Sequence, residues 1–257
     1  MILVMAGTSD ARELALRIAG AGYPVTASVV TESAAKSIEE AGPPVRAGRL
    51  NADGLYEWLR DNGIHTVVDA SHPFAEEASR NAMAAAKRAG VPYIRYERES
   101  GVYEPHGSLL YAEDYVQAAE LAAAKGGVVM LTTGSKTLHI FAERLLGKPN
   151  VTLVARMLPR KDNMEKCEQL GLEQRNIVAM QGPFSKELNA ALYRHYGVTL
   201  MITKESGKEG AVDEKLEAAL EAGIETIVIG RPKLEYDTVH TNFEAVLAEL
   251  AALTTEV

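Results

Sequence analysis

The sequence predicts an α/β fold made of two doubly wound parallel sheets. Short apolar runs alternate with segments of helical periodicity, and this series is interrupted once near the middle of the chain. The loops that follow the expected strands are rich in Gly, Ser, Thr and basic residues, whereas the loops that precede them are plain Gly turns. Because a buried parallel strand needs a crossover helix before the next strand, this alternation is typical of parallel sheets covered on both faces.

The composition is that of an ordinary globular protein, with 47% hydrophobic and 24% charged residues. A chain of 257 residues can bury a core in each of two halves. The formal charge of −8 argues against a broad basic face, so we expect no nucleic-acid partner. The one cysteine excludes an internal disulfide, and the histidines show no paired ligand spacing, so we expect no metal site. No apolar run is long enough for a membrane span and no targeting signal precedes Ile2, so we expect a cytoplasmic protein.

The N-terminal half begins with an expected strand, tight turn and helix. Ile2 to Met5 is apolar, Ala6 to Ser9 is small and polar, and apolar residues recur at helical spacing from Asp10 to Ile18. The further strands expected in this half are Val25 to Val30, Val45 to Ala47, Thr66 to Asp69 and Pro92 to Tyr96, with helices ending near Ala41, Asn62 and Ala89.

A polar, aperiodic stretch from Glu97 to Gly107 is interpreted as a linker. It divides the chain into an N-terminal Rossmann-like domain, residues 1–97, and a C-terminal Rossmann-like domain, residues 98–257. The strands expected in the second domain are Leu109 to Tyr111, Val128 to Leu131, Val151 to Ala155, Ile177 to Met180, Leu200 to Thr203 and Thr226 to Ile229, and a last helix is expected from Asn242 to Leu253. Since the loops after strands form the ligand edge of such sheets, we expect an inter-domain cleft.

The first of these loops has the features of an anion site. Gly7 can adopt a positive φ and leaves room for a phosphate, while Thr8 and Ser9 offer hydroxyl groups at the N-terminus of the following helix. The alternative is an ordinary strand-to-helix turn. Glu32 follows the second strand and lies 25 positions after Gly7. An acid there typically bonds a ribose 2′ hydroxyl, which favours NADH over NADPH; the alternative is a glutamate at the start of the next helix.

Later loops carry basic residues and one histidine. Thr133 to Thr137 resembles the end of a Walker A loop but lacks the Gly-Lys pair, so nucleotide hydrolysis is set aside. Lys136, Lys204 and Arg231 follow strands and can together bind carboxylates, unless they are simply solvated. His72 is expected to bind or orient a ligand, with proton donation as the alternative.

Seven segments, in the same order along the whole chain, resemble the precorrin-6A and cobalt-precorrin-6A reductase family of cobalamin biosynthesis. They are Met1 to Glu32, Val68 to Asn81 with its Ser-His-Pro-Phe sequence, Tyr93 to Arg98, Thr132 to Lys136, Gln181 to Asn189, Thr203 to Gly207, and Gly230 to Pro232. The resemblance implies a nicotinamide-dependent reductase that adds hydride and a proton across a ring D double bond of a corrin precursor. The implied substrate is a macrocycle edged with acetate and propionate groups.

The resemblance also assigns residues to the site. It places Gly7, Thr8, Ser9 and Arg12 with the cofactor, and it places Ser71, His72, Thr133, Gly134 and Ser206 around the cofactor and the macrocycle. Glu32 is a further candidate cofactor-binding residue. The further candidate substrate-binding residues are Lys136, Lys204, Gly207 and Arg231. His72 is the candidate catalytic residue. The resemblance to the cobalt-dependent branch likewise favours NADH.

Two other functions are alternatives to this one. A short-chain reductase needs a Tyr-x-x-x-Lys pair, and no tyrosine here has lysine four positions later. A two-lobed module that binds a nucleotide or small ligand without turnover has the same loops, so an assay of nicotinamide oxidation separates it from a reductase. The sequence leaves open whether the substrate contains cobalt, and it leaves the oligomeric state open.

Overall fold

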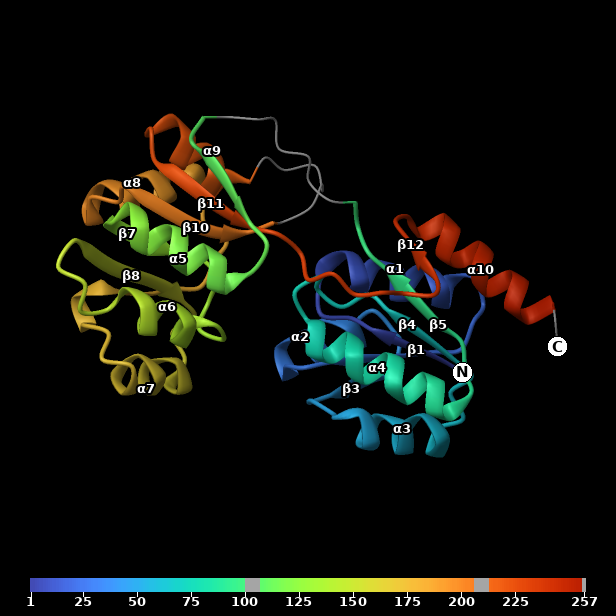
Figure 1. The fold of residues 1–257 in the computed structure, drawn as a ribbon. Helices are drawn as coiled ribbons and strands as arrows, with labels where there is room; N and C mark the ends of the chain where they lie inside the picture. The colour runs from blue at the N-terminus through green and yellow to red at the C-terminus, as the bar shows by residue number, and fades with distance from the viewer. Residues whose placement is uncertain (100–106, 206–212, 256–257) are drawn as a thin grey trace. The chain divides into compact units, whose positions relative to one another are not determined.

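The computed structural model describes residues 1–99, 107–205 and 213–255. It divides into two compact units, one formed by Met1–Glu99 and Lys233–Val257 and the other by Ser100–Pro232 (Figure 1). Each unit contains a six-stranded sheet in which every paired strand is parallel. The predicted α/β fold class of two doubly wound parallel sheets is therefore confirmed.

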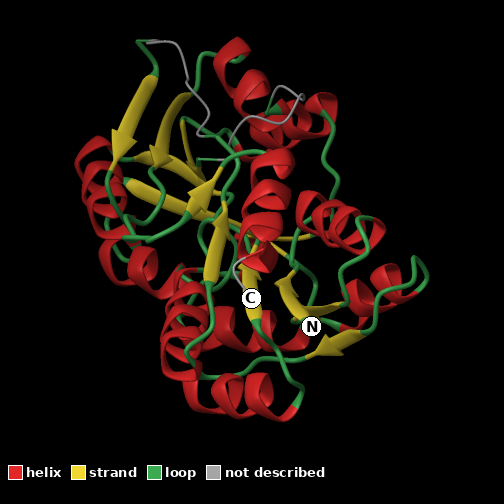
Figure 2. Cartoon of the chain, turned by 90° about the vertical axis from the view of Figure 1, so that its right-hand side faces the viewer, coloured by secondary structure: helices red, strands yellow, loops and turns green. Residues whose placement is uncertain are grey.

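The first sheet has the strand order β12-β5-β4-β1-β2-β3. Its strands are β1 (Ile2–Met5), β2 (Val25–Val29), β3 (Val45–Ala47), β4 (Thr66–Asp69), β5 (Tyr93–Tyr96) and β12 (Val239–His240). The helices of this unit are α1 (Ser9–Gly20), α2 (Glu32–Glu39), α3 (Ala52–Asp61), α4 (Glu76–Ala89) and α10 (Phe243–Thr255). Alternation within β1 shows how the sheet is covered, because Val4 packs in a cluster with α1, α2 and α10 while Leu3 packs in a cluster with α3 and α4. Helices thus flank the strands in the turned view (Figure 2).

The second sheet has the order β6-β11-β10-β7-β8-β9. Its strands are β6 (Leu109–Ala112), β7 (Gly127–Leu131), β8 (Val151–Met157), β9 (Ile177–Ala179), β10 (Leu200–Lys204) and β11 (Glu225–Ile229). The helices are α5 (Tyr115–Lys125), α6 (Leu138–Leu145), α7 (Lys161–Gln169), α8 (Lys186–Tyr196) and α9 (Glu214–Glu221), with a 3₁₀ turn η1 (Gln174–Asn176). One face of this sheet packs against α8 and α9 through Tyr193 and Leu216.

The C-terminal segment corrects the predicted domain boundary. The sequence predicts residues 98–257 as the second domain, whereas Lys233–Val257 belongs to the first unit. β12 pairs with β5, where Val239 lies in register with Arg95. Val246 and Leu250 of α10 are 0% and 2% exposed in the core around α1. Burial of these apolar side chains explains why the chain returns to the first sheet. Of the expected linker, residues 100–106 lie outside the described residues.

Both sheets share one connectivity. In each, the order of the first five strands is 3-2-1-4-5 when counted from β1 or from β7, and the sixth place is filled from a distant part of the chain. β6, which precedes β7, fills it in the second sheet, and β12 fills it in the first. The strand order therefore reverses between β1 and β4 and again between β7 and β10. Ligands bind at the carboxyl ends of the strands beside such a reversal.

Candidate functional site

The loop after β1 and the start of α1 form one wall of the reversal point in the first unit. Thr8 is extended and caps α1, since its Oγ1 accepts a hydrogen bond from Ala11 N at 3.3 Å. Gly7 differs from expectation, because its φ lies outside the positive region. Gly7 instead leaves open space beside the backbone, since a Cβ built there would have no atom within 4 Å. A ligand can therefore approach the backbone closely at this point.

Two side chains of the first turns of α1 carry buried polar atoms that have no hydrogen-bond partner among the described residues. They are Oδ1 of Asp10 and Nε of Arg12. Asp10 is 6% exposed, and its Oδ2 lies 3.8 Å from Nη1 of Arg98. Since a buried polar atom without a partner costs free energy, Arg12 Nε has capacity for an anionic ligand beside the positive end of the α1 dipole. Ser9 is the first residue of α1.

The loop after β4 is held by a buried ionic network that the sequence did not reveal. Asp69 and Arg95 are both 0% exposed, and Arg95 Nη1 lies 3.1 Å from Asp69 Oδ1. Asp69 also accepts hydrogen bonds from the backbone N and the hydroxyl of Ser71 and from Tyr93 OH. Arg95 donates to the carbonyl of Ser71 at 2.9 Å, while its Nε donates to Glu97 at 3.0 Å. The Ser71 hydroxyl is therefore part of a rigid network.

The C-terminal segment adds Tyr236 to this network. Its ring stacks on Tyr93 with centroids 6.3 Å apart, and the Cζ of Arg95 lies 5.5 Å from its centroid. Burial, followed by the charge of Asp69, raises the pKa of Tyr93. Burial opposes the charge of Arg95, yet Asp69, Tyr236 and Glu97 raise its pKa above the ordinary value. Arg95 is therefore a permanent cation with two carboxylate partners, and Tyr93 stays a neutral hydrogen-bond donor.

His72 forms a turn rather than projecting as an isolated side chain. Its Nδ1 accepts a hydrogen bond from Phe74 N at 3.2 Å, and its carbonyl accepts one from Ala75 N at 2.7 Å. A neutral imidazole that accepts at Nδ1 carries its proton on Nε2. Protonation of Nδ1 would direct a second N–H toward the N–H of Phe74. Acceptance at Nδ1 is compatible with an orienting role for His72, and this role stays a prediction.

Glu32 lies at the start of α2 and is exposed. The residue that caps this helix is Thr31, whose Oγ1 accepts from Ala34 N at 3.3 Å. Because Thr31 satisfies the cap, the carboxylate of Glu32 is not needed for that purpose, although an acid in the first turn is favoured by the helix dipole.

The reversal point of the second unit contains Thr133 and Gly134, which follow β7. Thr133 is 6% exposed, and its Oγ1 is buried without a hydrogen-bond partner in the part of the chain that the structure describes. Gly134 has φ +80°, a conformation that side-chain-bearing residues rarely adopt. Lys136 is exposed and precedes α6 instead of lying in its first turn; its carbonyl accepts from Lys166 Nζ at 3.1 Å.

The basic residues of the later loops differ in their surroundings. Lys204 ends β10 and is half-buried; burial, Lys215 and Lys136 lower its pKa. Arg231 is already paired, because its Nε lies 3.3 Å from Oε1 of Glu205. Ser206 and Gly207 lie outside the described residues. The expected cleft between the two domains stays a prediction.

Sequence reasoning missed Arg156 and Asn189 in this unit. Arg156 is the penultimate residue of β8, and Asn189 lies on α8. They are 8% and 0% exposed, and Arg156 Nη1 donates to Asn189 Oδ1 at 2.6 Å. The available signal is a charged residue inside the apolar run from Val151 to Met157, whereas the expected strand stops at Ala155.

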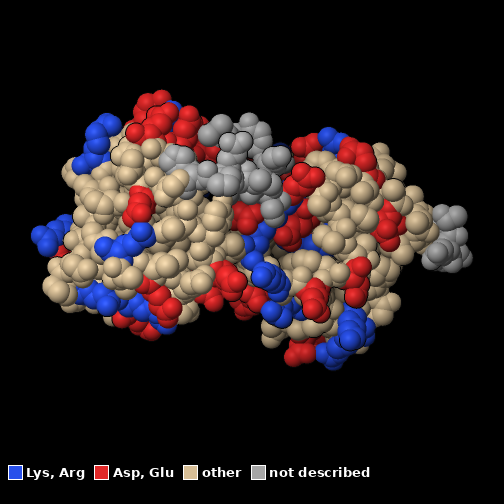
Figure 3. Space-filling view, turned by 45° about the horizontal axis from the view of Figure 1, so that its top comes forward, with Lys and Arg blue, Asp and Glu red and all other residues tan. Residues whose placement is uncertain are grey.

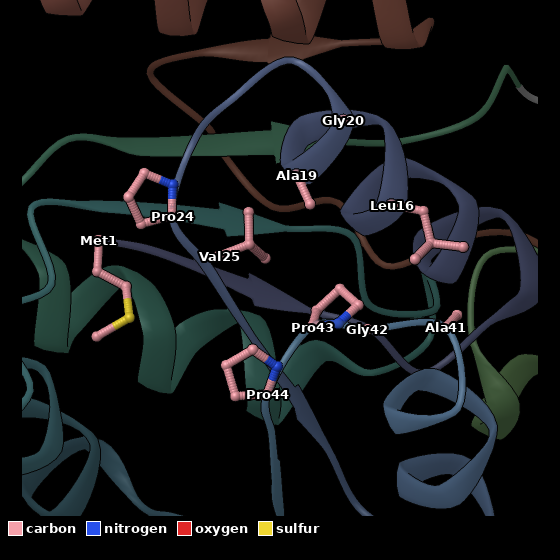
Figure 4. Close-up of a pocket in the computed structure, with 10 residues that line it drawn as sticks. All are labelled: Met1, Leu16, Ala19, Gly20, Pro24, Val25, Ala41, Gly42, Pro43 and Pro44. Atoms are coloured by element: carbon pink, nitrogen blue, oxygen red, sulfur yellow. The ribbon is translucent and has the colours of Figure 1, made fainter.

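An apolar pocket of about 720 Å³ lies at the opposite edge of the first sheet (Figure 4). Its walls include Met1, Pro24 and Pro44, which precede β1, β2 and β3. None of its lining residues carries a polar side chain, so none can bind a ribose or a phosphate through one. The carboxyl edge remains the better candidate for a dinucleotide.

The described residues contain neither a cluster of metal-binding side chains nor a helix that is long and apolar enough to cross a membrane. On the face shown in Figure 3, acidic and basic side chains are interspersed. The candidates for binding an anion are the basic residues of the loops described above.

Known proteins resemble this chain along nearly its whole length. A family model described as precorrin-6x reductase CbiJ/CobK matches residues 1–251. A cobalt-precorrin-6A reductase from Priestia megaterium is 56% identical over 250 residues, which cover 97% of this chain and 98% of the relative. One from Salmonella typhimurium strain LT2 is 40% identical over 232 residues, covering 90% and 87%. A solved structure of CobK precorrin-6A reductase superposes with a TM-score of 0.75 at 26% identity, covering 98% of this chain and 96% of that one.

Proposed function

The chain belongs to the precorrin-6x reductase CbiJ/CobK family, and from this premise we propose that it reduces cobalt-precorrin-6A to cobalt-precorrin-6B with NADH. The resemblance predicted from its loops is confirmed, and the chain is an NAD(P)H-dependent reductase of cobalamin biosynthesis. The family match over residues 1–251 carries this conclusion, because it includes both units.

The cobalt-containing substrate is the finer part of the proposal. The two relatives at 56% and 40% identity are named for the cobalt form, whereas the structure named without cobalt is 26% identical. In this substrate the metal belongs to the macrocycle and needs no ligand from the protein. Assay of the cobalt and metal-free forms side by side tests this choice, and a higher kcat/KM for the metal-free form would contradict it.

The reversal point of the first unit fits a nicotinamide dinucleotide. The open space at Gly7 and the N-terminus of α1 suit the pyrophosphate, and the buried Nε of Arg12 can donate to it. Thr8 and Ser9 complete this wall, and Ser71 lies in the loop across the reversal. When bound, the cofactor supplies a hydride equivalent; the protein binds and orients it.

Glu32 is the basis for NADH over NADPH. Its exposed carboxylate can accept hydrogen bonds from a ribose 2′ hydroxyl and would repel a 2′ phosphate. Replacing Glu32 with Arg is expected to reverse the ratio of kcat/KM for the two cofactors, because it replaces a repulsive charge with an attractive one. A clear NADPH preference in the wild type would refute this contact.

The second unit contributes cations for the acidic side chains of the macrocycle. Lys204 has the strongest support, since it is half-buried at the end of β10 among other lysines, an arrangement that an anion stabilises. Lys136 and Arg231 also lie in this group, with Arg231 oriented by Glu205. The buried hydroxyl of Thr133 can donate a hydrogen bond to a bound ligand. The left-handed backbone at Gly134 sets the course of this loop.

Reduction also needs one proton at the macrocycle. His72 is best suited to keep its loop in shape, because Nδ1 is occupied as an acceptor by Phe74 N–H. Bound water then supplies the proton, and His72 orients the ligand. Positioning of the two reactants can account for much of the acceleration.

A turnover assay tests the proposed function. The full chain is mixed with NADH and the cobalt-containing precursor, and the loss of nicotinamide absorbance is compared with formation of the reduced macrocycle. Equal amounts of NADH oxidised and macrocycle reduced are expected. Binding of both ligands without turnover would favour the alternative, a two-lobed binding module.

A matched pair of glycine variants tests the dinucleotide site. A Cβ at Gly7 or at Gly20 would meet no atom within 4 Å, but Gly20 lies at the far end of α1. Gly7→Leu is expected to raise the KM for NADH by about tenfold or more, since its side chain fills the space proposed for pyrophosphate. Gly20→Leu should leave this KM unchanged. Equal effects of the two substitutions would refute the placement.

A further inference from the structure

Arg156 is a buried cation without a carboxylate partner in the described part of the chain. It lies near the carboxyl end of β8 and is 8% exposed. Its one hydrogen bond to the described residues runs from Nη1 to Asn189 Oδ1, a neutral acceptor. Burial lowers the pKa of Arg156, which Tyr193 and Asp213 partly offset. Since arginine stays charged in proteins, an anionic ligand that reaches this guanidinium would be stabilised by it.

The surrounding residues hold the guanidinium in a fixed orientation. Its Cζ lies 4.1 Å from the centroid of the Phe184 ring, which supports one face. Asn189 donates through Nδ2 to the carbonyls of Phe184 and Ser185, at 3.2 and 2.8 Å. The same amide therefore fixes the loop before α8 and aligns Arg156. Gly182 leaves room for the Phe184 ring, because a Cβ at position 182 would lie 3.0 Å from Phe184 Cδ2.

The N–H groups on Nε and Nη2 make no hydrogen bond to the described residues. Together they form one edge of the guanidinium, which matches the two oxygens of a carboxylate. β8 is separated from β10 by β7 alone, so Arg156 and Lys204 belong to strands about 10 Å apart. This separation suits two different acidic side chains of one large ligand.

We propose that Arg156, aligned by Asn189 and Phe184, binds a carboxylate side chain of the tetrapyrrole substrate. This inference rests on the proposed function, which supplies a macrocycle with several carboxylates. A phosphate of the dinucleotide has related chemistry, but the features that suit the dinucleotide lie on the first unit. A preset planar donor on a buried strand also gives selectivity for one orientation of the macrocycle.

Steady-state kinetics of Arg156→Gln test this assignment. The KM for the macrocycle is expected to rise by about tenfold to one hundredfold, the range that loss of charge-assisted hydrogen bonds supports, while the KM for NADH stays within about twofold. Arg175→Gln is the matched control, because Arg175 lies in the same unit, is 80% exposed and pairs with Glu173. It should leave both KM values unchanged.

Phe184→Leu gives a second measurement that keeps the guanidinium and removes the ring beneath it. It is expected to raise the KM for the macrocycle by about threefold to tenfold without changing that for NADH. Thermal unfolding of each variant verifies that it is folded, and Phe184→Leu decides the matter if Arg156→Gln does not fold.

Two outcomes would overturn the inference, and a third would refute its premise. An increased KM for NADH with an unchanged KM for the macrocycle would assign Arg156 to a phosphate. An effect no larger than that of Arg175→Gln would show that no ligand anion meets Arg156. Failure of the wild type to oxidise NADH with the macrocycle would instead refute the proposed function, on which this inference depends.

Discussion

Replacement of Arg95 by Met is expected to destabilise the first unit strongly and to loosen the loop after β4. Arg95 is 0% exposed and bonds to Asp69, Glu97 and the carbonyl of Ser71. Methionine keeps the apolar stem but leaves the fully buried Asp69 without its cation. Removing one partner of a buried ion pair typically costs about 3–5 kcal/mol in the free energy of unfolding.

Urea denaturation followed by tryptophan fluorescence measures this cost in the correct unit. Trp58 is the single tryptophan of the chain and lies on α3 of the first unit. At an m-value of about 2 kcal/mol/M, a loss of 3–5 kcal/mol lowers the midpoint by roughly 1.5–2.5 M urea. Because two units can unfold separately, a probe confined to one of them keeps the transition interpretable.

Arg88→Met provides the matched control. Arg88 also forms an ion pair in the first unit, at 2.8 Å from Asp53, but the two side chains are 56% and 80% exposed. Exposed pairs contribute about 0–1 kcal/mol, so its midpoint should barely move. Equal shifts for Arg88→Met and Arg95→Met would refute the reasoning that burial makes the Arg95 network strong. Arg95→Met should also raise the KM for NADH, because Ser71 loses a donor that fixes its loop.

Three further predictions follow from single contacts. His72→Asn keeps an acceptor for the Phe74 N–H and should retain turnover within about threefold, since only one hydrogen bond is altered. If both His72→Asn and His72→Ala lose more than about tenfold in turnover at saturating substrate, His72 is the proton donor. The lowered pKa of Lys204 means that its charge is lost at a lower pH than 10.5. The KM for the macrocycle should therefore rise toward alkaline pH in the wild type but stay constant in Lys204→Arg. An equal alkaline rise in Lys204→Arg would show that Lys204 does not cause it. Leu250→Ala should lower the free energy of unfolding reported by Trp58 by about 2–5 kcal/mol, because Leu250 is 2% exposed in the core of the first unit. An unchanged unfolding transition would contradict the packing of α10 against this core.

Hydrophobic periodicity was sufficient to predict most of both sheets. A strand such as Thr66–Asp69 is buried on both faces, and its apolar run is therefore visible in sequence. β12 has only two residues, Val239 and His240, and neither its length nor its polarity predicts a strand. It exists because β5 offers an edge for pairing and α10 buries apolar residues beside it. These are long-range effects, which local patterns do not contain.

The candidate site was predictable in its position more than in its contacts. Loops after strands were expected to gather at the carboxyl edge, and Thr8, Ser71 and Thr133 do follow β1, β4 and β7. Their individual roles depend on neighbours that the sequence does not reveal. The hydroxyl of Ser71 donates to Asp69, whereas Thr133 Oγ1 has no hydrogen-bond partner among the residues that the structure describes. Two similar hydroxyl residues therefore differ in their capacity to bind a ligand.

The two buried strand arginines show why this difference matters for function. In sequence, Arg95 and Arg156 look alike, each being a single charge within an apolar run. Arg95 has Asp69 and Glu97 as partners, so its charge is balanced within the unit and its substitution should act first on stability. Among the described residues, the hydrogen-bond acceptor of Arg156 is the neutral Asn189, so a bound anion would balance its charge more fully. Its substitution should therefore act first on ligand affinity, and a comparison of unfolding midpoints and KM values in the two variants separates a structural cation from a binding cation.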